Sequence, residues 1–213
     1  PNTVLAADGV AGFLFRSDDG GVTWVDLPAI RAQLSETSAV GELYATIEAG
    51  VTTWYASTRF DGVLRSQDTG TTWTKLDAGL VGEARRVREV VRWRDTLFAG
   101  THDGVYIYDT GSSQWVRSSG FPTGLIVFSL TTAGDTLYAG SGEGVFYSGD
   151  AQTWTRAATF PATIVYDVAP AGDVVVAATD VGIYTGIADS WQQALLNGAP
   201  YGGFPGANMS GGC

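Results

Sequence analysis

The chain contains very few of the residues that redox, metal and acid–base chemistry most often use. Its 213 residues include one cysteine, Cys213, and one histidine, His102. A single cysteine excludes a disulfide within the chain, so Cys213 is either a free thiol or a link to another molecule. A histidine-based metal site or a Ser/His/Asp triad would depend on His102 alone. Because the other members of such sites do not occur at suitable spacings, we interpret His102 as a turn residue and expect no metal and no cofactor.

Long hydrophobic runs are also absent. No segment approaches the roughly 18 consecutive apolar residues that a membrane helix requires. Hydrophobic residues nevertheless make up 45% of the chain, which is enough for a packed interior. We therefore expect a secreted protein, extracellular or periplasmic, without a membrane span.

Positive charge is scarce as well. The chain has 12 Lys and Arg residues against 22 Asp and Glu residues, and its formal net charge is −10. Nucleic-acid binding needs a basic field over one face of a protein, so we expect no nucleic-acid partner. The acidity favours solubility and an attraction for cationic partners.

The most informative feature that the chain does contain is a repeat ending in tryptophan. Its two best copies, residues 17–24 and 66–73, both read S-x-D-x-G-x-T-W. The gaps between the tryptophans of five successive copies are 49, 42, 39 and 37 residues. A period in this range is typical of stacked or radially arranged supersecondary units.

The residue types in the repeat predict a β-hairpin. The Asp can accept backbone N–H groups across the turn, and the Gly can take a positive φ. The Thr and Trp then begin the return strand, with the indole packed over the hairpin. A metal site would need a second carboxylate at a fixed offset, which the copies lack, so we interpret the Asp as structural.

This pattern resembles the Asp-box, or bacterial neuraminidase repeat, of sialidases, sortilin-type receptors, oligoxyloglucan-cleaving hydrolases and a photosystem II assembly/stability factor. The resemblance implies a β-propeller in which the hairpin joins the third and fourth strands of each blade. Two copies are exact, the third has one extra residue, the fourth lacks one, and the fifth has lost its Asp. The residues that match the motif are Ser17, Asp19, Gly21, Thr23 and Trp24; Ser66, Asp68, Gly70, Thr72 and Trp73; Asp109, Gly111 and Trp115; Ser148, Asp150 and Trp154; and Trp191.

The sequence around each hairpin supports a four-stranded blade and an all-β fold. We expect first strands at 40–47, 87–93, 126–132 and 164–169, and second strands at 54–58, 96–101, 136–141 and 174–179. These segments are short, rich in β-branched and aromatic residues, and separated by Gly, Asp and Thr.

Five units predict a propeller of about five blades within residues 1–196, followed by a Gly-rich flexible tail at 197–213. The blades are expected at approximately 1–30, 38–80, 85–119, 124–159 and 162–195. Residues 3–7 match a second strand, so the first blade has no first strand before it. Either Leu195 and Leu196 begin a poor closing strand, or residues or a partner outside this chain complete the ring.

Five of the arginines lie within ten residues: Arg85, Arg86, Arg88, Arg92 and Arg94. One interpretation is a set of solvated strand charges in which Arg88 and Arg92 pair with Glu89 or Asp95. The other is a patch that binds an anion or a carboxylate, since clustered guanidinium groups suit acidic partners. Some members of the assembly-factor family carry a comparable patch.

The innermost strands should direct one set of side chains toward the propeller axis. Aligning the four recognisable strands gives two candidate columns. The first consists of Tyr44, Arg88, Phe128 and Tyr166, and the second of Ala45, Glu89, Ser129 and Asp167.

Turns between second and third strands form a further candidate surface on the face opposite the hairpins. The longest contains Arg59 and Phe60, with Trp54 shortly before it. Such a rim could stack a sugar or hold a peptide. Trp54 is alternatively an aromatic residue packed between blades.

Enzymatic activity is not expected. The F/Y-R-I-P motif that the resemblance to sialidases would require is absent, and the arginines cluster in one blade. Glu89 and Asp167 could approach across a channel as a carboxylate pair, but nothing else in the sequence indicates glycoside chemistry.

The sequence therefore predicts a non-catalytic binding scaffold for a protein partner, with Arg59, Phe60, Trp54, Arg85, Arg86, Arg88 and Arg92 as binding residues. One alternative is a lectin-like propeller that binds a glycan. A lectin would repeat the same polar and aromatic residues in each blade, and the turns here differ. Another is a structural subunit or homo-oligomer that assembles through its C-terminal tail. A glycoside hydrolase relative is the least favoured.

Overall fold

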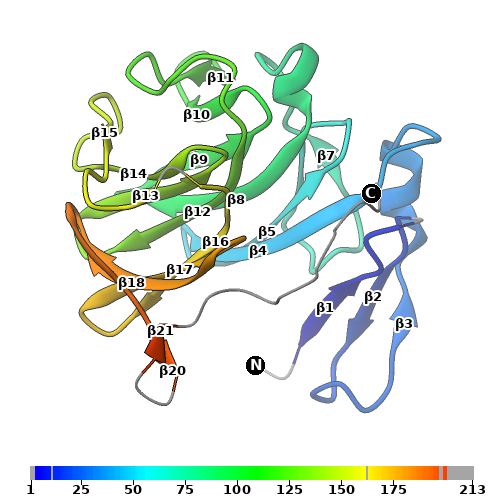
Figure 1. Ribbon diagram of the computed structural model, residues 1–213. Helices are drawn as coiled ribbons and strands as arrows, with labels where there is room; N and C mark the ends of the chain where they lie inside the picture. The colour runs from blue at the N-terminus through cyan, green and yellow to red at the C-terminus, as the bar shows by residue number, and fades with distance from the viewer. Residues whose placement is uncertain (1–2, 11, 162, 197–198, 201–213) are drawn as a thin grey trace.

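The computed structural model describes residues 3–10, 12–161, 163–196 and 199–200. Its strands form five antiparallel sheets arranged as the blades of a propeller (Figure 1), which confirms the all-β, five-bladed prediction. The end of the expected tail, including Cys213, lies outside the described residues.

The blades are numbered here in chain order. Blade 1 has three strands and the other four blades have four each. Their strands are β1 Val4–Ala7, β2 Leu14–Ser17 and β3 Val25–Asp26; β4 Val40–Glu48, β5 Val51–Thr58, β6 Val63–Ser66 and β7 Thr74–Lys75; β8 Val87–Trp93, β9 Thr96–Thr101, β10 Gly104–Asp109 and β11 Gln114–Arg117; β12 Val127–Ala133, β13 Thr136–Ser141, β14 Gly144–Ser148 and β15 Thr155–Arg156; and β16 Val165–Ala171, β17 Val174–Thr179, β18 Gly182–Ile187 and β19 Ser190–Gln193.

Short elements connect or follow the blades. The 3₁₀ helix η1 (Pro28–Gln33) precedes blade 2, and η2 (Gly82–Arg85) precedes blade 3. Strand β20 (Leu195–Leu196) pairs with β21 (Ala199–Pro200) in a separate two-stranded sheet. The interpretation of Leu195 and Leu196 as a closing strand of the ring is therefore wrong.

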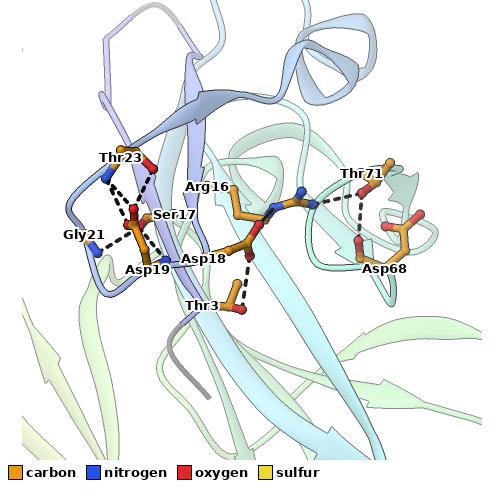
Figure 2. A network of polar contacts seen from close by, with 9 residues as sticks. All are labelled: Thr3, Arg16, Ser17, Asp18, Asp19, Gly21, Thr23, Asp68 and Thr71. Atoms are coloured by element: carbon orange, nitrogen blue, oxygen red, sulfur yellow. Dashed lines mark hydrogen bonds and ion pairs between the residues drawn. The ribbon is translucent and has the colours of Figure 1, made fainter.

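The predicted hairpins join the third and fourth strands, and the aspartates hold their turns. The Asp19 carboxylate accepts hydrogen bonds from the Ser17 hydroxyl at 2.7 Å and from the Thr23 hydroxyl at 2.6 Å. Backbone N–H groups of the turn also donate to it. Figure 2 shows this network, in which Arg16 reaches Thr71 of the next hairpin. These bonds favour the ionised form and lower the pKa of Asp19.

The tryptophans of the hairpins follow two different patterns. The indole N–H groups of Trp24 and Trp73 donate to carbonyl groups of their own turns, as expected. In contrast, Trp115 donates to Leu76 O at 2.6 Å, and Trp154 donates to Ser118 Oγ at 2.9 Å. Both acceptors belong to the preceding blade, so these two tryptophans link neighbouring blades.

The innermost strands carry a register irregularity that the alignment of the sequence did not anticipate. In β8, β12 and β16 the first strand has one residue more than its partner at this point, and β4 has the same one-residue excess between Val40 and Leu43. Glu89, Ser129 and Asp167 pair with Gly100, Gly140 and Ala178 of their second strands.

In blade 2 the equivalent position belongs to Glu42, whose N–H donates to Ser57 Oγ at 2.8 Å. The columns are therefore Gly41, Arg88, Phe128 and Tyr166, and Glu42, Glu89, Ser129 and Asp167. The assignment of Tyr44 and Ala45 was wrong because β4 runs two residues further beyond this position than β8 does, which misaligned the strands. Tyr44 instead accepts a hydrogen bond from the N–H of Arg92 at 3.1 Å.

Candidate binding site

A cavity of about 440 Å³ opens where the first strands of blades 2, 3 and 4 begin. Within a blade the strands are antiparallel, so the hairpin turns after β6, β10 and β14 lie at the other end of the sheets. The cavity thus lies on the face opposite the hairpins, where the sequence placed the binding surface. Its lining is Gly9, Ala39, Val40, Gly41, Glu42, Arg59, Arg86, Val87, Arg88, His102 and Phe128.

Three arginines of this face are positioned by aromatic rings. The guanidinium carbons of Arg59 and Arg86 lie 5.3 Å and 5.5 Å from the centroid of the Phe60 ring. The Arg88 guanidinium carbon lies 5.6 Å from the centroid of Phe128. Contacts of this kind attract a cation to a ring face without using its N–H groups.

Arg86 has a buried donor that the described residues leave unused. Its Nη1 contacts Glu83 Oε2 at 3.2 Å, while its Nε is buried and has no hydrogen-bond partner among the residues that the structure describes. A buried N–H without an acceptor is costly, by about 1–3 kcal/mol.

His102 lies in the turn between β9 and β10, one of the turns expected on this face, and lines the cavity. Its backbone N–H donates to Arg86 O at 3.1 Å. Its Nδ1 lies 3.8 Å from Glu83 Oε2. Burial lowers the pKa of His102 to about 4, helped by the charges of Arg86 and Arg88. The imidazole is therefore neutral at pH 7.

Carboxylates form a layer deeper along the axis than Arg88. Glu89 Oε2 accepts the N–H of Leu130 at 2.6 Å, and the Ser129 hydroxyl donates to Asp167 Oδ1 at 2.8 Å. Burial raises the pKa of Glu89 to about 7, and the charge of Glu42 adds to this effect. Glu42 has solvent-exposed surface, but the surrounding protein still raises its pKa by partial burial, and the charge of Asp167 adds to this effect. Glu89 and Asp167 belong to the same layer, and the charge of Asp167 also raises the pKa of Glu89.

The remaining arginines of the cluster do not reach the cavity. Arg85 pairs with Asp77 at 3.3 Å and bonds Leu80 O. Arg92 pairs with Glu48 at 2.7 Å and with Asp95 at 3.2 Å, at the far end of β8. The Arg92–Asp95 pair matches the interpretation as strand charges, whereas Arg86 and Arg88 line the cavity.

Arg94 and Trp54 also lie away from the cavity. Arg94 lies over Trp93, with 4.3 Å between the guanidinium carbon and the ring centroid. Trp54 packs against the hydrophobic core between blades 1 and 2. Trp54 therefore lies between blades, as the alternative interpretation expected.

Comparisons with solved structures show that the fold of this chain is that of a β-propeller. No protein-family model matches the sequence, and no curated protein matches it either. Among solved structures, the extracellular domain of BT4673 from B. thetaiotaomicron is similar, with 15% identity and a TM-score of 0.69 over 86% of this chain and 26% of that one. The chain folds as a β-propeller of this kind.

Two further structures are similar at comparable levels. YCF48 bound to a D1 peptide has 16% identity and a TM-score of 0.61, covering 90% of this chain and 63% of YCF48. The GH74 enzyme of Niastella koreensis has 17% identity and a TM-score of 0.63, covering 89% of this chain and 36% of the enzyme. The chain thus spans between about a quarter and two-thirds of the length of these three proteins.

Two negative findings concern the described residues alone. None of their helices is long and apolar enough to cross a membrane. Within the same residues, no group of three or more His, Cys, Asp and Glu side chains is arranged to hold a metal ion.

Proposed function

We propose that this protein is a non-catalytic, extracytoplasmic binding scaffold whose partner is a protein that presents a carboxylate to the axial cavity. The observation that carries the proposal is that Arg59, Arg86 and Arg88 line one cavity on the face opposite the hairpins. Guanidinium groups bind carboxylates through paired N–H donors, and such bonds are stronger than neutral ones.

The layers of the channel favour a carboxylate that stays at the rim. Below Arg88 the axis is lined by Glu42, Glu89 and Asp167, and these would repel an anion that entered deeply. A side chain or terminus at the surface of a protein partner satisfies this geometry. The site is also asymmetric, because Arg59, Arg86 and His102 have no counterparts at the cavity from blades 4 and 5. That asymmetry supports one protein site over repeated sugar sites.

The bound D1 peptide of YCF48 supports the same class of partner for a propeller of this fold. A glycoside hydrolase is the second candidate, since Glu89 has a pKa of about 7 and shares its layer with Asp167. We place it second because Glu89 Oε2 accepts the Leu130 N–H and Ser129 binds Asp167, so both carboxylates already hold the strands together.

The proposal is tested with a fluorescein-labelled hexapeptide that ends in two glutamates and a free carboxylate. Its amidated glutamine counterpart is the neutral probe, and fluorescence anisotropy reports binding. Arg86→Gln and Arg88→Gln should each weaken binding of the acidic peptide by about tenfold or more, the loss expected for one charge-assisted hydrogen bond. Arg94→Gln is the matched control at the other end of β8 and should bind as the original protein does.

Two results would reject the proposal. One is equal affinity for the acidic and the amidated peptide. The other is a loss of binding in Arg94→Gln that equals the loss in Arg86→Gln. Release of sugar from xyloglucan oligosaccharides that disappears in Glu89→Gln would instead support the hydrolase.

A further inference from the structure

Each pair of neighbouring blades buries one hydrophobic core. The described residues form four such cores, between blades 1 and 2, 2 and 3, 3 and 4, and 4 and 5. They form no fifth core between blade 5 and blade 1. These two blades lie at the two ends of the arc in Figure 1.

Every core is built from two unlike halves. One half faces the preceding blade and repeats one pattern, in which a central Ala pairs across the strands with a large side chain. Its members are Trp54, Ala56, Leu64 and Trp73; Leu97, Ala99, Tyr106 and Trp115; Leu137, Ala139, Phe146 and Trp154; and Val175, Ala177, Tyr184 and Trp191. We call this half the preceding face.

The other half, the following face, points to the next blade. It consists of three residues: one from the second strand, one from the third strand, and one that follows the fourth strand. The backbone N–H of this last residue donates a hydrogen bond to the backbone carbonyl of the third-strand residue. Its members are Leu5, Leu14 and Leu27; Tyr55, Val63 and Leu76; Phe98, Val105 and Ser118; and Tyr138, Val145 and Ala157.

Blade 1 has a preceding face with no blade against it. Ala6 pairs with Phe15 in the same register as the other Ala positions, and Val4 and Trp24 complete the set. Val4 is 40% exposed and Trp24 43%, whereas the equivalent Trp73 is 4% exposed. Phe13 extends this apolar surface by stacking on Phe15, with 6.2 Å between ring centroids.

Blade 5 has the complementary following face, formed by Val176, Ile183 and Ala194. The N–H of Ala194 donates to Ile183 O, as that of Ala157 does to Val145 O in blade 4. Ile183 is 38% exposed, while Val145 is fully buried. One chain thus carries both halves of an interface that it forms four times internally, and the residues that the structure describes leave one copy of each half without a partner blade.

We propose that a second copy of this chain docks head to tail, with its blade 5 following face on the blade 1 preceding face of the first copy. The occupant is identified by continuity: the docked pair would repeat the contact already made between blades 4 and 5. Because the two halves differ, the contact is heterologous, and each complex keeps one free half at either end. The surface is separate from the carboxylate cavity, so the two proposals stand independently.

The test uses two variants that each block one half. Val4→Asp places a charge on the preceding face, and Ile183→Asp places one on the following face. Both positions are partly exposed, so we expect both variants to fold, which circular dichroism and thermal unfolding check. Molar mass is measured by size-exclusion chromatography with light scattering, in the presence of a reductant so that Cys213 cannot cross-link.

We expect the unmodified protein to form species larger than 22.3 kDa that grow with concentration between about 1 μM and about 1 mM, the range of weak interfaces. Each variant alone should remain a monomer of 22.3 kDa. An equimolar mixture of the two should form a dimer and nothing larger, because one intact half remains on each. Val116→Asp, 53% exposed on the outer strand of blade 3, is the matched control and should assemble like the unmodified protein.

Three results would overturn the proposal. The first is an unmodified protein that stays monomeric over the whole concentration range. The second is assembly by either single variant alone, which would indicate a different contact. The third is a mixture of the two variants that contains only monomers.

Discussion

The Nε of Arg88 donates a hydrogen bond to the Nε2 of His102 at 3.0 Å, across the wall of the cavity. The acceptor nitrogen must carry a lone pair, so this bond assigns the imidazole proton to Nδ1, on the side of Glu83. Two positive neighbours and burial oppose a second proton. The histidine therefore adds a neutral hydrogen-bonding surface beside Arg59, Arg86 and Arg88.

This contact leads us to expect that His102 does not become charged at physiological pH. Its ring resonances, followed by nuclear magnetic resonance, should titrate with a pKa of about 4. Since folding lowers this pKa below the ordinary value of 6.5, the unfolded chain binds more protons, and the contribution of His102 to stability is lost as the pH falls below 6.5. Arg88→Gln should raise the pKa, and Arg94→Gln should leave it unchanged. A midpoint near 6.5 in the unmodified protein would contradict the burial argument.

Glu89 should have the opposite dependence on pH. Its pKa rises from 4.5 to about 7 on folding, so the folded protein binds the extra proton, and stability from this group is present below pH 4.5 and lost as the pH rises through 7. Glu89→Gln keeps an acceptor for the Leu130 N–H but cannot ionise. We expect the midpoint of thermal unfolding to fall less between pH 5 and pH 8 in this variant. Glu36→Gln, on an exposed loop, is the control and should follow the unmodified protein.

The hairpin aspartates should contribute to stability without binding metal. Asp68 accepts hydrogen bonds from the Ser66 and Thr72 hydroxyls and from the Thr72 N–H. Asp68→Ala should lower the free energy of unfolding in urea by about 1–2 kcal/mol, since these partners are close to water and regain part of their bonding. Gln67→Ala next to it should change it by less than about 0.5 kcal/mol. Stabilisation by added Ca²⁺ that Asp68→Ala abolishes would oppose the structural role.

The repeat was sufficient to predict the fold because each copy carries its own turn chemistry. Asp19 and Asp68 make their bonds within a few residues, and Gly21 and Gly70 have the positive φ that the turn needs. Such local requirements are visible in a single sequence.

The candidate site was predicted only in part, because it depends on how blades meet. Arg86 and Arg88 line the cavity, whereas Arg92 lies at the other end of the same strand and is engaged by Glu48 of blade 2. Glu42 occupies the position expected for Ala45, because β4 runs two residues further beyond it than β8 does beyond Glu89, and the residue types do not show this extra length. The turn of His102 was expected on this face, but its hydrogen bond with Arg88 of the neighbouring strand is not encoded in any spacing.

The close approach of blades 2 and 3 should make one glycine, Gly79, far more costly to replace than a glycine of similar φ in an open turn. Gly79 follows blade 2 with a φ of +90°, and a Cβ at this position would lie 2.1 Å from Trp115 O of blade 3. Gly50 has a similar φ of +82° in the β4–β5 turn, with no atom within 4 Å of such a Cβ. Gly50→Ala should therefore cost only the left-handed backbone conformation, about 1–2 kcal/mol. Gly79→Ala adds a clash that must separate the two blades, and its total cost should reach about 3–5 kcal/mol. Urea unfolding followed by tryptophan fluorescence measures both, and equal losses would show that the Trp115 carbonyl moves aside without cost.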